Sequence, residues 1–169
     1  MIEVRITADL KGKAKTIAER KQRENKGLKN YNPEIYKLDM NNRWYTGILG
    51  ELVFEQLLID NSKQYKYESL HAGKADEGDF TIELKDYGKF KLDVKTCSQP
   101  GYVMMLTPKK AKRYPLYVGV RMNGEVAEIH GVARQEDLYD VTKPKPRIPC
   151  IGMRLDELHD IAKLLGVML

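Results

Sequence analysis

Three charged residues in the middle of the chain have the types and spacing of a hydrolytic metal site. Asp79 is followed, after 13 intervening residues, by Asp93 and Lys95. Mg²⁺ is held by one or two carboxylates together with water and a substrate phosphate. The ion polarises a phosphodiester and lowers the pKa of a bound water, while a lysine can orient that water or stabilise developing charge. The pattern therefore predicts metal-dependent phosphodiester hydrolysis.

The elements that must position these residues form a hairpin of two strands, expected over 79–85 and 90–97. The apolar residues of both strands occupy even positions, and the charged residues of the site occupy odd positions. Side chains alternate between the faces of a sheet, so the apolar sets are buried together only if the numbers of facing residues have an even sum. A three-residue loop over 86–88, with its glycine in the left-handed conformation, closes such a register.

This register places Asp79 opposite Lys95 and Thr81 opposite Asp93. Asp79 and Asp93 then become diagonal neighbours on the polar face, with Cα atoms about 7–8 Å apart. Two carboxylates at that separation can converge on one ion. The alternative to a metal site is an exposed strand face on which these charged residues form cross-strand ion pairs.

A third carboxylate is available from a helix expected over 44–60. Glu51 lies in this largely apolar segment directly after Gly50, where the missing side chain lets another backbone approach closely. No basic residue lies within one helical turn of Glu51, so a local ion pair does not account for it. Glu55, one turn further on, is an alternative or second ligand. The non-functional alternative is that Glu51 is a solvated residue on the helix surface.

Together these residues resemble the PD-(D/E)XK nuclease superfamily, which has the restriction-endonuclease-like fold. The second half of the motif is present as Asp93-Val94-Lys95, and Gly78 stands in place of the nominal proline before Asp79. The segment GILGELVFEQLL is similar to the first core helix of the superfamily. The later VGVRMNGEVAEIHGVARQEDL resembles the strands and helix that complete the sheet in small phage and viral members.

The resemblance implies a set of site residues. It implies that the metal ligands are Glu51, Asp79, Asp93 and the backbone carbonyl of Val94, with Lys95 as the catalytic lysine. It implies Mg²⁺ as the cofactor, with Mn²⁺ able to substitute, and Thr96 and Ser98 as contacts to the substrate backbone. Asp76 and Glu77 are alternatives to Asp79, although both precede the expected strand. Beyond residue 98, where such families have a helix, this chain has Pro100-Gly101 and then strand-like residues.

The charge of the chain points to an anionic partner. The formal net charge is +5, and residues 1–30 carry nine basic and four acidic side chains, so they supply all of the excess. Basic side chains bind the phosphate backbone of nucleic acids. The alternative is a solvated helix surface. The expected contacts to DNA are Lys11, Lys15, Arg20, Arg23, Lys26 and Arg43.

The element pattern predicts one α/β domain over residues 1–169, with a basic helical segment at 1–43. We expect a restriction-endonuclease-like core with a mixed central sheet of about five strands flanked by helices. Helices are expected over 9–26, 44–60 and 154–166, a loop or a short broken helix over 26–43, and a loop over 143–149. Strands are expected at 2–6, 64–70, 79–85, 90–97, 102–106, 116–122 and 125–133, with a hairpin turn at Asn123-Gly124.

The sequence also bounds the setting in which the chain works. No apolar run reaches the roughly 18 residues of a membrane span, and two cysteines cannot build a disulfide framework. We therefore expect a cytoplasmic protein, in the host cell if it is viral. The expected activity is that of a Mg²⁺-dependent deoxyribonuclease, more an endonuclease than an exonuclease. The alternatives are a Holliday-junction resolvase, which would work as a homodimer, and a catalytically silent nucleic-acid-binding protein of the same fold.

Overall fold

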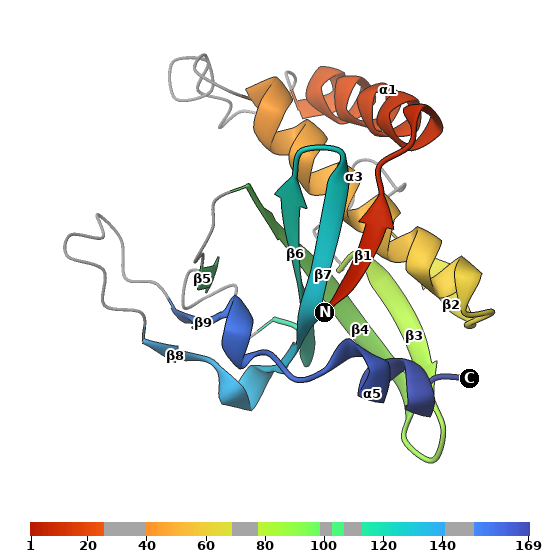
Figure 1. Ribbon diagram of the computed structural model, residues 1–169, viewed down its shortest axis with the longest axis vertical. Coiled ribbons are helices and arrows are strands. Elements are labelled where there is room, and N and C mark those ends of the chain that lie inside the picture. Colours follow the sequence, from red (N-terminus) through yellow and green to blue (C-terminus); the bar gives the residue numbers. More distant parts are fainter. Residues whose placement is uncertain (26–39, 69–77, 99–102, 107–112, 141–150) are drawn as a thin grey trace.

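A computed structural model describes residues 1–25, 40–68, 78–98, 103–106, 113–140 and 151–169. The architecture is α/β, with one mixed six-stranded sheet and a smaller three-stranded sheet (Figure 1). The larger sheet has the order β1-β7-β6-β4-β3-β2, and the smaller has the order β5-β9-β8. The strands are β1 (Ile2–Arg5), β2 (Tyr65–Tyr67), β3 (Phe80–Leu84), β4 (Gly88–Cys97), β5 (Val103–Leu106), β6 (Leu116–Asn123), β7 (Val126–Arg134), β8 (Tyr139–Asp140) and β9 (Ile151–Arg154).

The larger sheet is mixed because β4 and β6 are parallel, whereas its other neighbouring strands are antiparallel. The crossover from β4 to β6 contains β5, which pairs with β9 in the smaller sheet. The expectation of about five strands is thus close for the larger sheet, but the smaller sheet was not foreseen. Its strands β8 and β9 have only two and four residues, which is too short for a clear alternating pattern.

One long helix covers a face of the larger sheet, and a second long helix packs against the first (Figure 1). Helix α3 (Met40–Asp60) crosses that face, and α1 (Ala8–Asn25) packs against α3 (Figure 1). Thr7 caps α1, since its Oγ1 accepts a hydrogen bond from the backbone N–H of Leu10 at 3.2 Å. Helix α3 begins at Met40, so residues 40–43 are helical, which agrees with the second of the two alternatives expected for 26–43. Residues 26–39 lie outside the described part of the chain.

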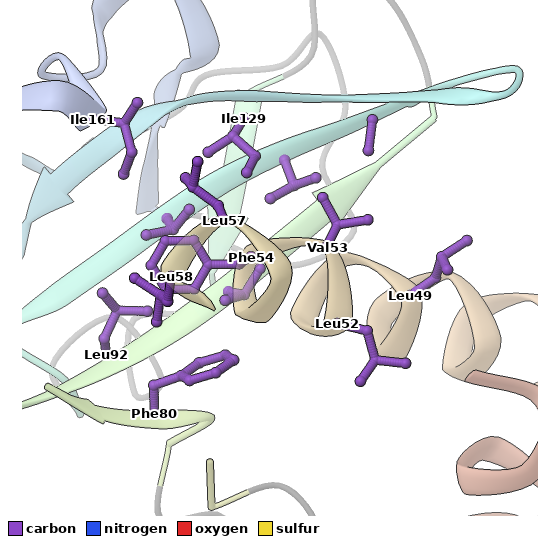
Figure 2. Packing of buried hydrophobic residues seen from close by; sticks show 14 of the residues in the cluster. Leu49, Leu52, Val53, Phe54, Leu57, Leu58, Phe80, Leu92, Ile129 and Ile161 are labelled. Carbon is purple, nitrogen blue, oxygen red and sulfur yellow. The ribbon is translucent and has the colours of Figure 1, made fainter. Parts of the chain in front are cut away.

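The main core lies between α3 and the sheet. Figure 2 shows Phe54, Leu57 and Leu58 of α3 lying among the labelled side chains of β3, β4 and β7, whereas Leu52 points away from these strands. The Phe54 ring meets the Phe80 ring edge-on, with centroids 5.3 Å apart. This helix is apolar on nearly all sides because it contacts the sheet on one side and α1 on another. Its buried residues include Ile48, Leu49, Leu52, Val53, Phe54, Leu57 and Leu58.

The register of the β3–β4 hairpin is even, as the apolar pattern predicts. Phe80 faces Leu92, so the apolar residues of both strands share the face under α3. Thr81, however, faces Lys91 rather than Asp93, a shift of two residues from the expected pairing. The expected position of Asp79 opposite Lys95 is wrong for the same reason, because this register directs residue 79 toward Asp93. The shift arises because the three-residue loop is 85–87, one position earlier than expected, with Asp86 as well as Gly88 at positive φ. Aspartate tolerates this conformation better than most residues do.

The expected closing helix over 154–166 is wrong in its first half. Arg154 ends β9, the 3₁₀ turn η2 (Leu155–Glu157) follows, and α5 (Ile161–Val167) begins only after Asp160. The interruption is caused by β7, because the backbone of His159 exchanges two hydrogen bonds of 2.9 Å with Val132. The other 3₁₀ turn is η1 (Gln135–Asp137). Within the described ranges, no helix is both long and apolar enough to cross a membrane.

Candidate metal-binding site

A close contact between α3 and β4 sets the position of Glu51. Gly50 lies against Thr96, and a Cβ atom built on Gly50 would be 2.0 Å from Thr96 Oγ1. Only glycine permits this approach. The contact fixes the position of α3 along β4, and it therefore fixes the position of Glu51, the next residue in the helix. The expectation that the backbone approaches closely at Gly50 is confirmed.

Asp79 lies directly before β3, at the edge of the hairpin. Its backbone N–H donates to the carbonyl of Leu92 at 3.0 Å, and its Oδ2 accepts a hydrogen bond from the N–H of Val94 at 2.7 Å. The preceding Gly78 has φ +91°, and a Cβ there would be 3.2 Å from the Tyr114 ring. Proline is locked near φ −65° and cannot adopt this conformation. Gly78 therefore has a backbone conformation that favours glycine and excludes proline.

The carboxyl of Asp79 is in an environment that disfavours its charge. Burial raises the pKa of Asp79 well above its usual range, and the charges of Glu51 and Asp93 raise it further. The hydrogen bond from Val94 and the charge of Lys95 act in the opposite direction but do not cancel the effect. Such interactions require the groups to be near one another. Glu51, Asp93 and Lys95 therefore lie near Asp79.

Asp93 and Lys95 leave β4 on the face opposite α3. Asp93 alternates with Leu92 and Val94, which belong to the main core, and its own side chain is also buried. Its Oδ2 forms an ion pair with the Lys95 ammonium. Tyr117 of β6 pairs with Asp93 and is fully buried, and this burial raises the pKa of its hydroxyl.

Glu51 lies on the α3 side of the sheet and is also buried. The hydroxyl of Tyr67 in β2 donates a hydrogen bond of 2.7 Å to Glu51 Oε2. Glu55, the alternative ligand, accepts a hydrogen bond of 3.1 Å from Tyr65, and burial together with the Glu55 charge raises the pKa of Tyr65 to about 12. It is Glu51, rather than Glu55, whose charge raises the pKa of Asp79. Sequence reasoning missed both tyrosines, although their spacing of two in a short strand places them on one face.

The donor chemistry of this cluster fits a hard divalent cation, because buried carboxylates that repel one another are stabilised by one. The side chains do not form a closed cage. In the described part of the chain, no three acidic, histidine or cysteine residues are grouped so that they could hold a metal ion. Each carboxylate instead has a partner from the protein. Tyr67 donates a hydrogen bond to Glu51, the Val94 N–H donates one to Asp79, and Lys95 forms an ion pair with Asp93. Coordination by one or two carboxylates plus water, as Mg²⁺ prefers, is compatible with this arrangement.

The residues expected to contact nucleic acid are dispersed. Lys11 is in an ion pair with Glu125 at 2.7 Å, Lys15 is exposed on α1, and Arg20 is partly buried. The Thr96 hydroxyl is buried beneath α3 against Gly50, whereas Ser98 is exposed directly after β4. Arg23 and Arg43 lie in α1 and α3 at positions whose side chains are not described, and Lys26 lies outside the described residues, as do the alternative ligands Asp76 and Glu77.

Comparisons with known proteins add no family to this picture. A scan against protein-family models found no match, and searches of curated proteins and of solved structures found none either. The functional argument therefore depends on the residues of this chain and their arrangement.

Proposed function

We propose that this chain is a metal-dependent nuclease that hydrolyses DNA phosphodiester bonds, with Mg²⁺ as its cofactor and Mn²⁺ as a substitute. The observation that carries the proposal is the grouping of carboxylates where the β3–β4 hairpin meets α3. Glu51 and Asp93 are both buried, and Asp79 accepts a hydrogen bond of 2.7 Å from the N–H of Val94, the residue after Asp93. In agreement with this grouping, burial and the charges of Glu51 and Asp93 raise the pKa of Asp79. Strongly perturbed titratable groups with specific charged partners are typical of functional sites. The order of elements supports the resemblance to PD-(D/E)XK nucleases, because the helix that carries Glu51 precedes the hairpin that carries Asp93 and Lys95.

Each residue has a defined part in this proposal. Glu51, Asp79 and Asp93 would supply carboxylate oxygens to the metal ion, directly or through bound water, together with the carbonyl of Val94. When bound, the metal ion would polarise the scissile phosphodiester and lower the pKa of a water. Lys95, whose ammonium now pairs with Asp93, would orient the attacking water or stabilise negative charge on the phosphate oxygens.

A second candidate is a nucleic-acid-binding protein of this fold without catalytic turnover. It is favoured by one observation, namely that each of the three carboxylates already has a partner from the protein, a hydrogen bond for Glu51 and Asp79 and an ion pair for Asp93. In such a protein these contacts would stabilise the fold rather than await an ion. The two candidates differ in whether the carboxylates bind a divalent cation.

The test is a cleavage assay with the full chain on supercoiled plasmid, linear duplex, single strand and a four-way junction, with and without Mg²⁺ or Mn²⁺. We expect nicked or linear plasmid only when the metal is present. Asp93→Asn and Lys95→Ala should each lower the rate by about 10²–10⁴-fold. Lys89→Ala and Glu83→Gln are matched controls, because these residues pair with each other on the same hairpin near its loop. Both should cleave at the wild-type rate.

The outcomes separate the candidates. Cleavage that persists in both Asp93→Asn and Lys95→Ala would contradict the site. Salt-sensitive DNA binding without any cleavage would favour the binding protein. Cleavage restricted to the four-way junction would identify a resolvase, which sedimentation should then show to be a homodimer.

A further inference from the structure

Two tyrosines of β2 are hydrogen-bonded to two glutamates of α3. Tyr67 donates to Glu51 at 2.7 Å, and Tyr65 donates to Glu55 at 3.1 Å. Both tyrosines are partly buried and pack against the main core. The pairs have the same chemistry, and they differ in position: Glu51 is close enough to Asp79 for its charge to act on that carboxyl.

The Tyr67 hydroxyl is held in place by its ring. That ring stacks on the Phe80 ring, with centroids 4.9 Å apart and planes 17° apart. Phe80 faces Tyr67 across the β2–β3 ladder and directly follows Asp79 in the chain. The phenol thus links the Glu51 carboxylate to the strand that begins at Asp79.

A single hydrogen bond to a carboxylate fixes the rotation of the group and leaves its other lone pairs able to bind a cation or accept further hydrogen bonds. An ionised carboxylate offers about four lone-pair sites, and the Tyr67 hydroxyl is directed at Oε2 of Glu51. Groups that hydrogen-bond to metal-binding carboxylates orient them for the ion, and their removal typically weakens metal affinity by about 10–100-fold.

We infer that Tyr67 is a positioning residue for the metal site, which holds the buried Glu51 carboxylate in the orientation that a divalent cation requires. The inference rests on the proposed function, because it presumes that Glu51 is a ligand. Tyr65 has no such role. Its partner Glu55 lies one helical turn beyond Glu51, and Glu55 is not among the charges that raise the pKa of Asp79.

The test measures Mn²⁺ binding directly, by electron paramagnetic resonance and calorimetry, on the full wild-type chain and on Tyr67→Phe and Tyr65→Phe. Each variant loses one hydroxyl and keeps its ring. We expect Mn²⁺ to bind Tyr67→Phe about 10-fold more weakly than wild type, and Tyr65→Phe within about 2-fold. The Mg²⁺ concentration for half-maximal plasmid cleavage should rise in Tyr67→Phe, with the rate at saturating Mg²⁺ restored.

The possible failures are distinguishable. If the wild type binds Mn²⁺ and cleaves plasmid but Tyr67→Phe binds Mn²⁺ equally well, the positioning role is refuted and the nuclease proposal stands. If both variants weaken binding to the same extent, the effect is a general loss of α3–β2 packing and the inference is also refuted. If the wild type binds no Mn²⁺, both the proposed function and the inference are refuted.

Discussion

Gly50 and Thr96 lie so close together that the side chain of alanine would not fit between them. A Cβ on Gly50 would be 2.0 Å from Thr96 Oγ1 and 3.0 Å from Thr96 Cβ. This contact joins the helix that carries Glu51 to the strand that carries Asp93 and Lys95. The arrangement of the candidate site therefore depends on a residue without a side chain.

The first prediction concerns this contact. Gly50→Ala should lower the free energy of unfolding by about 1–3 kcal/mol, because the new methyl group overlaps Thr96. Gly47→Ala, one turn earlier, meets nothing within 4 Å and should raise the stability by up to about 1 kcal/mol through helix propensity. Denaturant unfolding of both variants makes the comparison.

A double variant checks the cause. Thr96→Ala removes the atom that is 2.0 Å away and leaves only Cβ at 3.0 Å, so Gly50→Ala should be less destabilising in that background. The coupling free energy should be about 0.5–3 kcal/mol. If the two substitutions have simply additive effects, the overlap is not the reason for the glycine.

The second prediction is that Asp79→Asn stabilises the metal-free protein at neutral pH while it abolishes cleavage. The folded state raises the pKa of Asp79 above its ordinary value of 3.8, so between the unfolded and folded pKa values the native state binds more protons. Stability from this group is present in acid and is lost as the pH rises through that window. Asparagine has no charge to lose and can still accept the hydrogen bond from Val94.

Thermal unfolding as a function of pH measures this effect. The Tm of Asp79→Asn should exceed that of wild type at pH 7, by about 2–4 °C for each kcal/mol, and the difference should vanish below pH 3.8. Mg²⁺ should raise the Tm of wild type more than that of the variant, because it binds the folded wild type preferentially. A variant that is less stable at pH 7 would contradict the buried-charge interpretation.

The third prediction concerns the ion pair between Lys95 and Asp93. Lys95→Ala removes the partner of a side chain that is only 5% exposed, and removal of one member of a buried pair is strongly destabilising. Because the Lys95 side chain is itself 31% exposed, we expect a loss of about 1–3 kcal/mol rather than the full effect of a buried pair.

Lys89→Ala in the same strand is the control, since Lys89 is exposed and should change stability by less than about 0.5 kcal/mol. Unfolding in urea measures both variants. Equal stability of Lys95→Ala and Lys89→Ala would show that the ion pair with Asp93 does not stabilise the fold. The result also matters for the cleavage assay, which must be run at a temperature where Lys95→Ala remains folded.

The fourth prediction tests the basic helix α1. Lys15 is exposed on this helix, so Lys15→Ala should weaken DNA binding uniformly across sequences and reduce the slope of log K against log salt by about 1. Lys89→Ala, on the outer end of the β3–β4 hairpin, should leave the slope unchanged. In Figure 1 that hairpin loop and α1 lie at opposite ends of the molecule. Identical slopes for Lys15→Ala and wild type would exclude this part of α1 from the interface.

Several features could be predicted from the sequence because they depend on local periodicity. Alternation of apolar residues in β3 and β4 requires an even register, and the structure confirms it. The apolar run of α3 predicts a buried helix, and Gly50 within it predicts a close approach. These patterns can be recognised because a strand shifted by one residue, or a helix without its 3.6-residue repeat of apolar positions, would expose apolar side chains to water.

The tertiary structure decided the features that depend on distant partners. The closing helix is interrupted because His159 pairs with Val132 of β7, and no pattern near His159 reveals that partner. Likewise, Glu51 and Glu55 are one helical turn apart, and the sequence favours Glu51 only through the neighbouring Gly50. The structure adds that the charge of Glu51 acts on Asp79. The sequence by itself determined which residues have the chemistry of the candidate site. The packing of α3 on β4 and of Tyr67 on Phe80 decided which of them meet, because such contacts join residues that are far apart in the chain.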